Sequence, residues 1–224
     1  MDGNGRWARA RGKDRLEGHW AGYRTLKRIV YAADELGIEY LTVYGFSSEN
    51  WKRPDIEVSG LMRLMLSAMR AEIEELIANG IRVRVIGRLD GLPQDLRDEF
   101  QAAMVRTAPN GRMTFTLAIN YGGRHEIVDA VRSLALSVAD GSLAPSEIEE
   151  TTIQERLYAP ETPDPDLLIR TAGEMRLSNY LLWQSAYAEL WVTPTLWPDF
   201  SREDLSEALA EFGRRTRRFG AVVE

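Results

Sequence analysis

Short apolar runs alternate along the chain with stretches of helical period. Five short segments are rich in β-branched and other apolar residues and predict strands; they span residues 38–46, 81–87, 113–121, 166–171 and 188–194. Between these segments, apolar residues recur every three or four positions, as on one face of a helix. The longest such stripe runs from Val58 to Leu76, and an earlier one runs from Tyr23 to Ala33. Asn79-Gly80 follows the longer stripe and predicts a left-handed helix end before the next strand.

Strands that alternate with helices through short connections predict a parallel sheet. We therefore expect an α/β fold: a single domain over residues 1–224, with a mostly parallel central sheet of about six strands flanked by helices. The 224 residues and the 44% apolar content suffice for one large buried core. Segment 140–165 is richest in Pro, Asp and Glu, but it carries a helical pattern over 145–158 and does not separate two domains.

The chain opens with MDGNGRWARARGKDR, which predicts a flexible loop rich in hydrogen-bond donors and not the start of a helix. In parallel sheets such loops follow the carboxyl ends of strands, where ligands bind. The sequence has no strand in front of this loop, so we expect the first strand of the sheet to be missing from the chain.

Composition narrows the classes of function. The net charge of −6 argues against general nucleic-acid binding. The chain has no cysteine, which excludes disulfides and thiolate metal sites and fits a reducing compartment. It has no run of 18 apolar residues and no signal-peptide pattern, so we expect a cytoplasmic protein without a membrane span.

The loop around Asp2 has the chemistry of a phosphate site. Gly3 and Gly5 let backbone N–H groups approach a phosphate closely, and a nearby helix start would add its dipole. The Asp2 carboxylate could hold Mg²⁺, which takes oxygen ligands and shares them with diphosphates. A tight turn capped by Asp2 and Asn4 explains the same residues without any ligand.

Two more segments follow predicted strands and carry polar side chains. RTAGEMRLSN provides Arg170, Arg176 and Ser178, a donor cluster without compensating acids that suits a diphosphate. FSSENWKRP provides polar donors and two aromatic walls: Ser47, Ser48, Asn50 and Arg53, with Phe46 and Trp51. The alternatives are a solvated loop for the first segment and a polar turn around a buried tryptophan for the second.

The two histidines are ambiguous by themselves. His19 lies near the arginine-rich start, and His125 follows Gly122-Gly123; each could be a hydrogen-bonded structural residue. The sequence has no HExxH, CxxC or P-loop pattern, which removes support for zinc hydrolysis and for P-loop phosphoryl transfer.

Six blocks, taken in order, make the sequence recognisable: MDGNGRWA, GHWAG, FSSENWKRP, NYGGR, LIRTAGEMRLSNYLLWQSAYAEL and LWPDF. Together they resemble the cis-prenyltransferases, the undecaprenyl diphosphate synthase family, over the whole chain. Members of this family carry a short strand immediately before the DGNGRW loop, in agreement with the strand that we expect to be missing.

The resemblance implies an Mg²⁺-dependent transferase. Such enzymes condense isopentenyl diphosphate with an allylic diphosphate, usually farnesyl diphosphate, and form each new double bond in cis. For this chain the resemblance implies a homodimer that makes a Z-polyprenyl diphosphate of the undecaprenyl type, a lipid-carrier precursor for cell-wall glycan. The product would be delivered to the inner face of the membrane from the cytoplasm. The growing lipid needs an apolar tunnel, which the Val58–Leu76 stripe could line; ordinary core packing explains the stripe equally well.

The resemblance also assigns roles to residues. Asp2 matches the essential aspartate that binds Mg²⁺ and helps the allylic diphosphate leave, and Glu189 matches an acidic residue of the metal region. The allylic diphosphate site is matched by Gly3, Asn4, Gly5, Arg6, Trp7, Arg15 and His19. Asn50 matches a catalytic residue implicated in proton removal; its loop also supplies Phe46, Ser47, Ser48, Glu49, Trp51 and Arg53 to the substrates. The isopentenyl diphosphate clamp is matched by Arg170, Arg176 and Ser178.

Near the C-terminus, Arg218-Phe219-Gly220 resembles an RxG element that reaches the partner's active site in the dimer. The sequence departs from the family pattern at Ala172, usually Gly or Ser, and at Met175, often a polar residue. One alternative within the fold is a non-catalytic partner subunit of a heteromeric prenyltransferase, which should have lost Asp2 or the arginine clamp. A phosphate-binding regulatory module is a second alternative, and it predicts binding without turnover.

Overall fold

The computed structural model describes residues 1–217. Its α-helices are α1 (Asn4–Arg9), α2 (Arg15–Glu35), α3 (Asp55–Ala78), α4 (Gln94–Thr107), α5 (Gly123–Ala139), α6 (Glu150–Gln154) and α7 (Arg202–Arg214). Its strands are β1 (Tyr40–Ser47), β2 (Ile81–Ile86), β3 (Met113–Tyr121), β4 (Leu167–Arg170) and β5 (Glu189–Val192). All five segments predicted as strands therefore contain one, and α2 and α3 contain the two predicted apolar stripes.

All strand pairs of the described residues are parallel. β3 lies between β1 and β2, and β4 pairs with β5 in a second group. The predicted α/β fold with a parallel sheet and flanking helices is confirmed. β1 and β4 are the edge strands that face the same large cavity, of about 940 Å³, which Met1 also lines. The strand expected before Asp2 concerns residues outside this sequence, so it stays a prediction.

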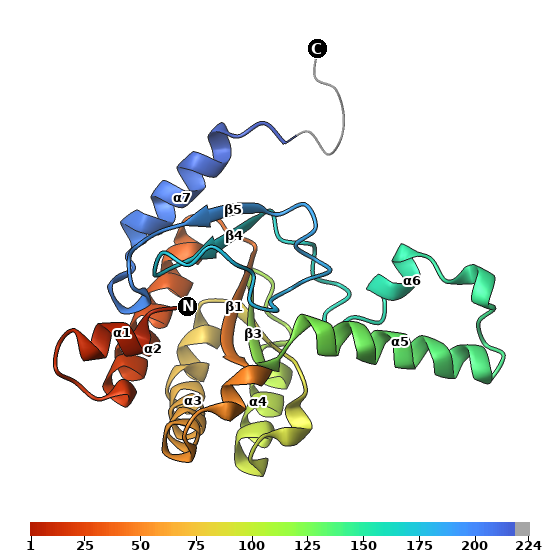
Figure 1. Cartoon of the computed structure of the whole chain (residues 1–224), viewed down its shortest axis with the longest axis horizontal. Coiled ribbons are helices and arrows are strands. Elements are labelled where there is room, and N and C mark those ends of the chain that lie inside the picture. Colours follow the sequence, from red (N-terminus) through yellow and green to blue (C-terminus); the bar gives the residue numbers. More distant parts are fainter. Residues whose placement is uncertain (218–224) are drawn as a thin grey trace.

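The helices enclose one main core. α2, α3 and α4 gather on one side of the β1–β3–β2 group, whereas α5 and α6 extend away from the body (Figure 1). β3 is buried along nearly its whole length, and apolar residues of β2, α3 and α4 pack against it. Gly80 has a φ of +69°, so the left-handed end of α3 is confirmed.

The prediction of a loop at the N-terminus was wrong, because residues 4–9 form helix α1. Gly3 adopts a φ of +110°, which only glycine tolerates easily, and turns the chain into the helix. Tertiary packing then fixes α1 against α2: a Cβ on Gly18 would lie 2.2 Å from the Asn4 carbonyl oxygen, and one on Gly22 would lie 2.2 Å from Asn4 Oδ1. The helix thus depends on two glycines of another element, which local propensity does not register.

The helix predicted over 145–158 is also broken up. The structure has a short 3₁₀ turn at Pro145–Glu147 and then α6. Side chains bind the backbone between these two pieces: the Ala144 N–H donates to a Glu147 carboxylate oxygen, and the Thr152 hydroxyl donates to the Glu147 carbonyl. Such local bonds compete with a continuous helix.

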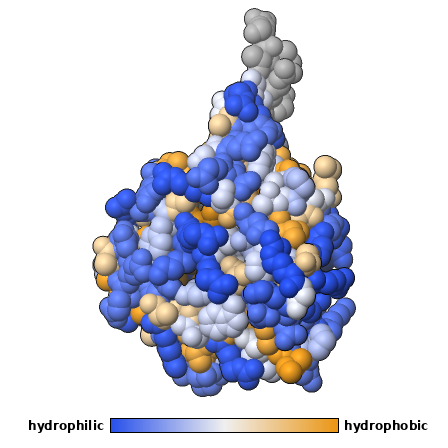
Figure 2. Space-filling model, turned by 90° about the vertical axis from the view of Figure 1, so that its left-hand side faces the viewer, coloured by the Kyte–Doolittle hydropathy of each residue, from blue (hydrophilic) through white to orange (hydrophobic). Residues whose placement is uncertain are grey.

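The surface is largely polar on the side that carries α1. Figure 2 shows this face, where hydrophilic residues predominate and hydrophobic ones form small separate patches. Over residues 1–217, no helix combines the length and the hydrophobicity that a membrane crossing requires.

Candidate active site

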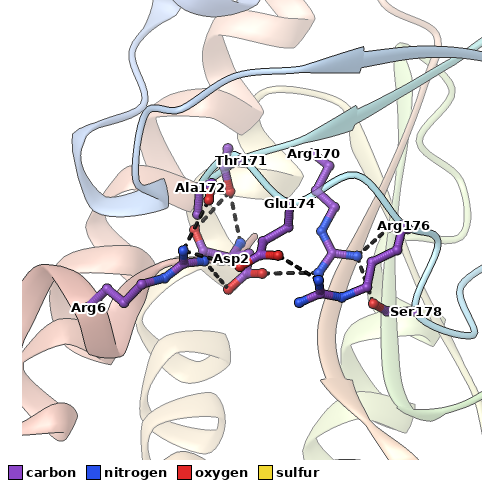
Figure 3. Close-up of polar contacts among 8 residues, drawn as sticks. All are labelled: Asp2, Arg6, Arg170, Thr171, Ala172, Glu174, Arg176 and Ser178. Atoms are coloured by element: carbon purple, nitrogen blue, oxygen red, sulfur yellow. Dashed lines mark hydrogen bonds and ion pairs between the residues drawn. The ribbon is translucent and has the colours of Figure 1, made fainter.

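Asp2 lies against the end of β4, where the chain leaves the strand (Figure 3). The Nη2 of Arg170 donates to Asp2 Oδ2 at 3.0 Å. The Asp2 N–H donates to Thr171 Oγ1 at 2.9 Å, and the Thr171 hydroxyl donates to the Asp2 carbonyl at 2.8 Å. Arg6, one turn into α1, brings Nη2 to 3.5 Å from Asp2 Oδ1. The N-terminal segment is thereby fixed to a loop more than 160 residues away.

The Asp2 carboxylate is ionised at neutral pH. Partial burial raises its pKa, but the hydrogen bond from Arg170 and the charges of Arg170 and Arg6 outweigh burial and hold the pKa below its usual value. An ionised carboxylate at the surface of a cavity is available to a cation or to a partner donor.

The predicted isopentenyl clamp is assembled around Arg170. Its Nη1 donates to Ser178 Oγ at 2.7 Å and also to the Arg176 carbonyl. The clamp is not free of acids, however, contrary to the prediction from the sequence. Glu174 lies 3.2 Å from Arg6 Nη1 and 2.5 Å from Arg176 Nη1, so it balances part of the positive charge. An anionic ligand would have to compete with Glu174 for these arginines.

Left-handed residues shape the clamp loop. Ala172 has a φ of +70°, and Ser178 and Asn179 have values of +52° and +63°. The departure from the family pattern at Ala172 therefore falls at a position that favours glycine. A hydrogen bond of 2.8 Å from the Ala172 N–H to the Thr195 carbonyl helps to hold this conformation. Met175, the second departure, is 82% exposed and contributes no polar atom to the site beyond its backbone.

Glu57 is a site residue that the sequence analysis missed. Glu57 is 4% exposed, and its carboxylate contacts three predicted substrate residues: Arg15 at 3.0 Å, His19 Nε2 at 3.1 Å and Arg53 at 3.0 Å. A signal existed in the sequence, because Glu57 stands four residues before Leu61 and next to Val58, where the helical period of α3 faces the interior. An acid at such a position is buried only when it is paired.

Glu57 and His19 set each other's protonation. Burial lowers the pKa of His19, and the hydrogen bond and charge of Glu57 oppose this only in part. Burial raises the pKa of Glu57, but His19, Arg53 and Arg15 together hold it below its usual value. The result is a charged carboxylate that orients two arginines and a largely neutral imidazole toward the cavity.

The loop after β1 is held by its own side chains. The Ser47 N–H donates to Asn50 Oδ1 at 3.1 Å, and the Trp51 indole N–H donates to Asn120 Oδ1 at 2.7 Å. Glu49 accepts from Asn179 Nδ2 at 2.8 Å, which ties this loop to the clamp loop. Phe46 is buried beneath it, in edge contact with Trp51.

Most of the predicted site residues face the 940 Å³ cavity. Its lining includes residues 2–6, Arg15, His19, Ser47, Asn50, Arg53, Arg170, Arg176 and Ser178. The lining does not include Trp7, Phe46, Ser48, Glu49, Trp51 or Glu189. Trp7 instead donates to Asp199 at 2.6 Å on the other side of α1.

The similarity to known proteins now identifies the family. A family model described as "Putative undecaprenyl diphosphate synthase" matches residues 1–220. The chain belongs to this family. It is 50% identical to the isoprenyl transferase of Heliobacterium mobile over 222 residues, which cover 99% of this chain and 85% of that protein. It is 48% identical to the isoprenyl transferase of Thermotoga maritima, covering 100% of this chain and 95% of that one.

Solved structures agree with the family assignment. Lavandulyl diphosphate synthase from Lavandula x intermedia, in complex with dimethylallyl diphosphate, superposes with a TM-score of 0.96 at 41% identity, covering 98% of this chain and 95% of that chain. A "probable undecaprenyl diphosphate synthase" from Campylobacter jejuni gives a TM-score of 0.79 at 32% identity, covering 89% and 92%. This prenyltransferase is therefore an enzyme of the transferase class.

Asp2 and Glu189, which were predicted to share the metal region of the prenyltransferase site, are not paired with each other. Glu189 begins β5 opposite Leu167, three residues before the arginine that touches Asp2, and its carboxylate pairs with Arg215 at 2.9 Å. Over residues 1–217, no three acidic or histidine side chains gather as a metal site. Asp2 alone still fits Mg²⁺, because this ion is often held by a single carboxylate together with substrate phosphates. The RxG residues Arg218 and Gly220 lie outside the described residues.

A second, apolar cavity of about 150 Å³ adjoins the prenyltransferase site. It begins at Met1, Asn4 and His19 and runs between α2 and α3. Most of its walls are apolar side chains of both helices and of the sheet, including Leu61, Met65 and Met69 of the predicted Val58–Leu76 stripe. The stripe thus lines a cavity and packs the core at once.

Proposed function

We propose that this prenyltransferase condenses isopentenyl diphosphate with an allylic diphosphate, farnesyl diphosphate in the first instance. The product is a Z-polyprenyl diphosphate of the undecaprenyl type, the precursor of a lipid carrier for cell-wall glycan. The proposed setting is the cytoplasm, with release of the product to the inner face of the membrane.

One observation carries the proposal: the large cavity, which Asp2 and Arg170 line, adjoins an apolar one. Diphosphates need charge-assisted donors, and prenyl chains need an apolar wall. Arg6, Arg15 and His19 line the large cavity, and His19 lines the apolar one too. An allylic diphosphate bound at the junction would have its head near Arg6 and Arg15 and its tail between α2 and α3.

The arginines of the site would act by binding the diphosphates and stabilising their negative charge. As the allylic carbon–oxygen bond breaks, negative charge grows on the departing diphosphate, and fixed guanidinium groups stabilise it best in a site that excludes water. Arg6 and Arg15 would serve this diphosphate, whereas Arg176 and Ser178 would hold that of isopentenyl diphosphate. The new carbon–carbon bond leaves a proton to be lost from the isopentenyl unit, and Asn50 would orient that step. Mg²⁺, held by Asp2 and substrate phosphates, would supply Lewis-acid stabilisation of the leaving group.

The proposed active form is a homodimer in which Arg218 and Gly220 reach the partner's site. A non-catalytic partner subunit remains the alternative. It is disfavoured because the chain keeps Asp2, Arg170 and Arg176, and because the first two are in direct contact.

The test is a chain-elongation assay. The protein is incubated with Mg²⁺, farnesyl diphosphate and radiolabelled isopentenyl diphosphate, and the extracted lipids are separated by chromatography. We expect labelled polyprenyl diphosphates with several added units. A protein that binds both substrates without forming labelled lipid would be a silent subunit, and one that binds neither would lie outside the proposed function.

A further inference from the structure

Asn179 joins three segments that each follow a strand. It belongs to the clamp loop after β4, directly after Ser178. Its side-chain Nδ2 donates to Glu49 Oε1 at 2.8 Å in the loop after β1. Its Oδ1 accepts from the Arg124 N–H at 2.9 Å, and its carbonyl accepts from the Gly123 N–H at 2.7 Å, both at the start of α5 after β3. Both polar atoms of this side chain are therefore used, and each bond leads out of the clamp loop.

The backbone around Asn179 is left-handed. Its φ is +63°, and that of Ser178 before it is +52°. Asparagine is one of the few residues besides glycine that take up this conformation readily, because its short polar side chain can bond locally. Three hydrogen bonds to other segments hold Asn179 in this conformation. They therefore also fix the preceding peptide, and with it the place of the Ser178 side chain.

The three segments approach one another closely at Gly122, which is buried. A Cβ at this position would lie 2.7 Å from Asn179 Nδ2 and 2.7 Å from Ser48 Oγ. Such distances are well below van der Waals contact, so a side chain here would displace the Asn179 amide from the loop after β1. The first glycine of the NYGGR block thus makes room for the junction that Asn179 forms.

Both partners of the Asn179–Glu49 bond stand next to a residue of the proposed active site. Ser178, before Asn179, accepts from Arg170 Nη1 at 2.7 Å and lines the large cavity. Asn50, after Glu49, lines the same cavity. Asn179 and Glu49, although both are described by the structure, do not belong to that lining. Their bond therefore sets the relative position of two lining residues from behind the cavity wall.

The Glu49 carboxylate is charged at neutral pH. Burial raises its pKa, but the hydrogen bond from Asn179, together with bonds from the Glu49 backbone, Ser48 and Ser47, holds the pKa below its usual value. An amide N–H that donates to a carboxylate makes a charge-assisted bond, about twice as strong as one between neutral groups. The junction is therefore sensitive to charge, because a carboxylate in place of the amide would face Glu49 as a like charge.

We propose that Asn179 is a positioning residue of the prenyl transfer. Through Glu49 it fixes the isopentenyl diphosphate clamp at Ser178 relative to Asn50, which is proposed to orient proton loss. This inference rests on the proposed function and adds the residue that aligns its two groups. A displaced clamp would hold isopentenyl diphosphate out of line, and a misplacement of about 1 Å can cost about 100-fold in rate. The allylic diphosphate site, on α1 and α2, would be affected little.

The test exchanges the two groups of the Asn179–Glu49 bond. Asn179→Asp keeps the side-chain size and the acceptor for the Arg124 N–H, but it sets two carboxylates against each other. In steady-state kinetics we expect kcat/KM for isopentenyl diphosphate to fall at least about 10-fold, with the KM for farnesyl diphosphate within about twofold. Asn179→Asp/Glu49→Gln restores an amide facing a carboxylate in reverse order, so kcat/KM should return to within about threefold of the unaltered protein.

A second variant and a matched control complete the design. Asn179→Gly keeps the left-handed backbone but removes both side-chain bonds, so it should show the same selective loss, and it serves if Asn179→Asp fails to fold. The control is Gln94→Glu on α4, where Gln94 Nε2 donates to Asp98 Oδ1 at 2.7 Å on the surface. This variant also sets two carboxylates against each other, but it should leave kcat and both KM values unchanged.

The positioning role would be overturned by a loss that persists in a folded Asn179→Asp/Glu49→Gln protein, or by normal kinetics in Asn179→Gly. An equal rise of both KM values in Asn179→Asp would overturn it too, because this would indicate general loosening of the site. If the unaltered protein formed no labelled lipid, the proposed function would fail first and the role of Asn179 with it.

Discussion

Arg170 Nη2 lies 3.0 Å from Asp2 Oδ2, although 168 positions separate these residues in the sequence. The family resemblance assigns Asp2 to the allylic diphosphate and Arg170 to the isopentenyl clamp. In the structure the two groups touch, so neither subsite is independent of the other. Arg170 also binds Ser178, which makes it the link between the clamp and the carboxylate proposed to bind the metal.

Replacement of Asp2 should abolish most of the activity. In Asp2→Ala, Arg170 and Arg6 lose their carboxylate and Mg²⁺ loses its protein ligand, so we expect turnover to fall at least about 100-fold. Circular dichroism should show an intact fold, because the backbone bonds of residue 2 with Thr171 remain possible. Asp90→Ala, at a fully exposed position, is the control and should be fully active. Near-normal turnover in Asp2→Ala would contradict the assignment of this site.

The clamp arginines should differ in their effects. The Arg176 side chain pairs with Glu174 in the structure and is proposed to bind isopentenyl diphosphate. Arg176→Ala removes this charge-assisted bond, so it should raise the KM for isopentenyl diphosphate about 10- to 100-fold. The KM for farnesyl diphosphate should change much less. Arg170→Ala should affect both substrates, because Arg170 also holds Asp2. Arg132→Ala, on the exposed side of α5, is the control. Equal effects of Arg176→Ala on both substrates would mean that the subsites are assigned wrongly.

Glu57 should position the allylic site. Glu57→Gln keeps the size of the side chain but removes the charge that gathers Arg15, His19 and Arg53, so we expect a higher KM for the allylic diphosphate. We also expect a loss of about 1–3 kcal/mol in the free energy of unfolding, because buried donors to a charge lose part of their partner. Denaturant titration and steady-state kinetics measure the two effects. The exposed Glu74, paired with Arg106, provides Glu74→Gln as a control that should show neither.

The environment of His19 predicts a pH dependence of stability. Burial lowers the pKa of His19 in the folded state, against the opposing contribution of Glu57. Below about pH 6.5 the unfolded chain therefore binds more protons at this residue than the folded one, so the free energy of unfolding falls on acidification. His19→Gln should remove this part of the slope between about pH 5.5 and 7.5, whereas His125→Gln should retain it. A slope unaltered by His19→Gln would refute the prediction.

Gly45 should tolerate little volume. It lines both cavities, and a Cβ there would lie 2.6 Å from Ile119 Cδ1. Gly45→Leu would therefore push its side chain into the apolar cavity, and we expect shorter products in the elongation assay. Gly111→Leu is the control, because a Cβ at Gly111 would meet none of the described residues within 4 Å. An active Gly45→Leu enzyme with unchanged product length would reject this course of the prenyl chain.

The sequence alone determined the elements whose residue pattern is strong. The segments that contain β1 to β5 were predicted from their runs of β-branched and apolar residues, and the stripes of α2 and α3 were predicted because burial on one helix face leaves an apolar residue every three or four positions. Most of the site residues that the family blocks indicated also line the large cavity, since the match is made residue by residue. Helix α1 left no such mark: it exists because Gly18 and Gly22 let Asn4 approach α2.

Only the tertiary structure decided how the site residues are paired. Glu57 gathers three predicted residues from one helix and one loop, Glu174 balances two arginines, and Glu189 turns to Arg215 and not to Asp2. The ion pairs of Lys27 with Glu72 and Glu75 were likewise hidden, because all three are ordinary charged residues in their own helices. Pairing of charges depends on distances in space between elements, which a linear pattern does not encode. The free-energy cost of an unpaired charge also rises when burial removes its water.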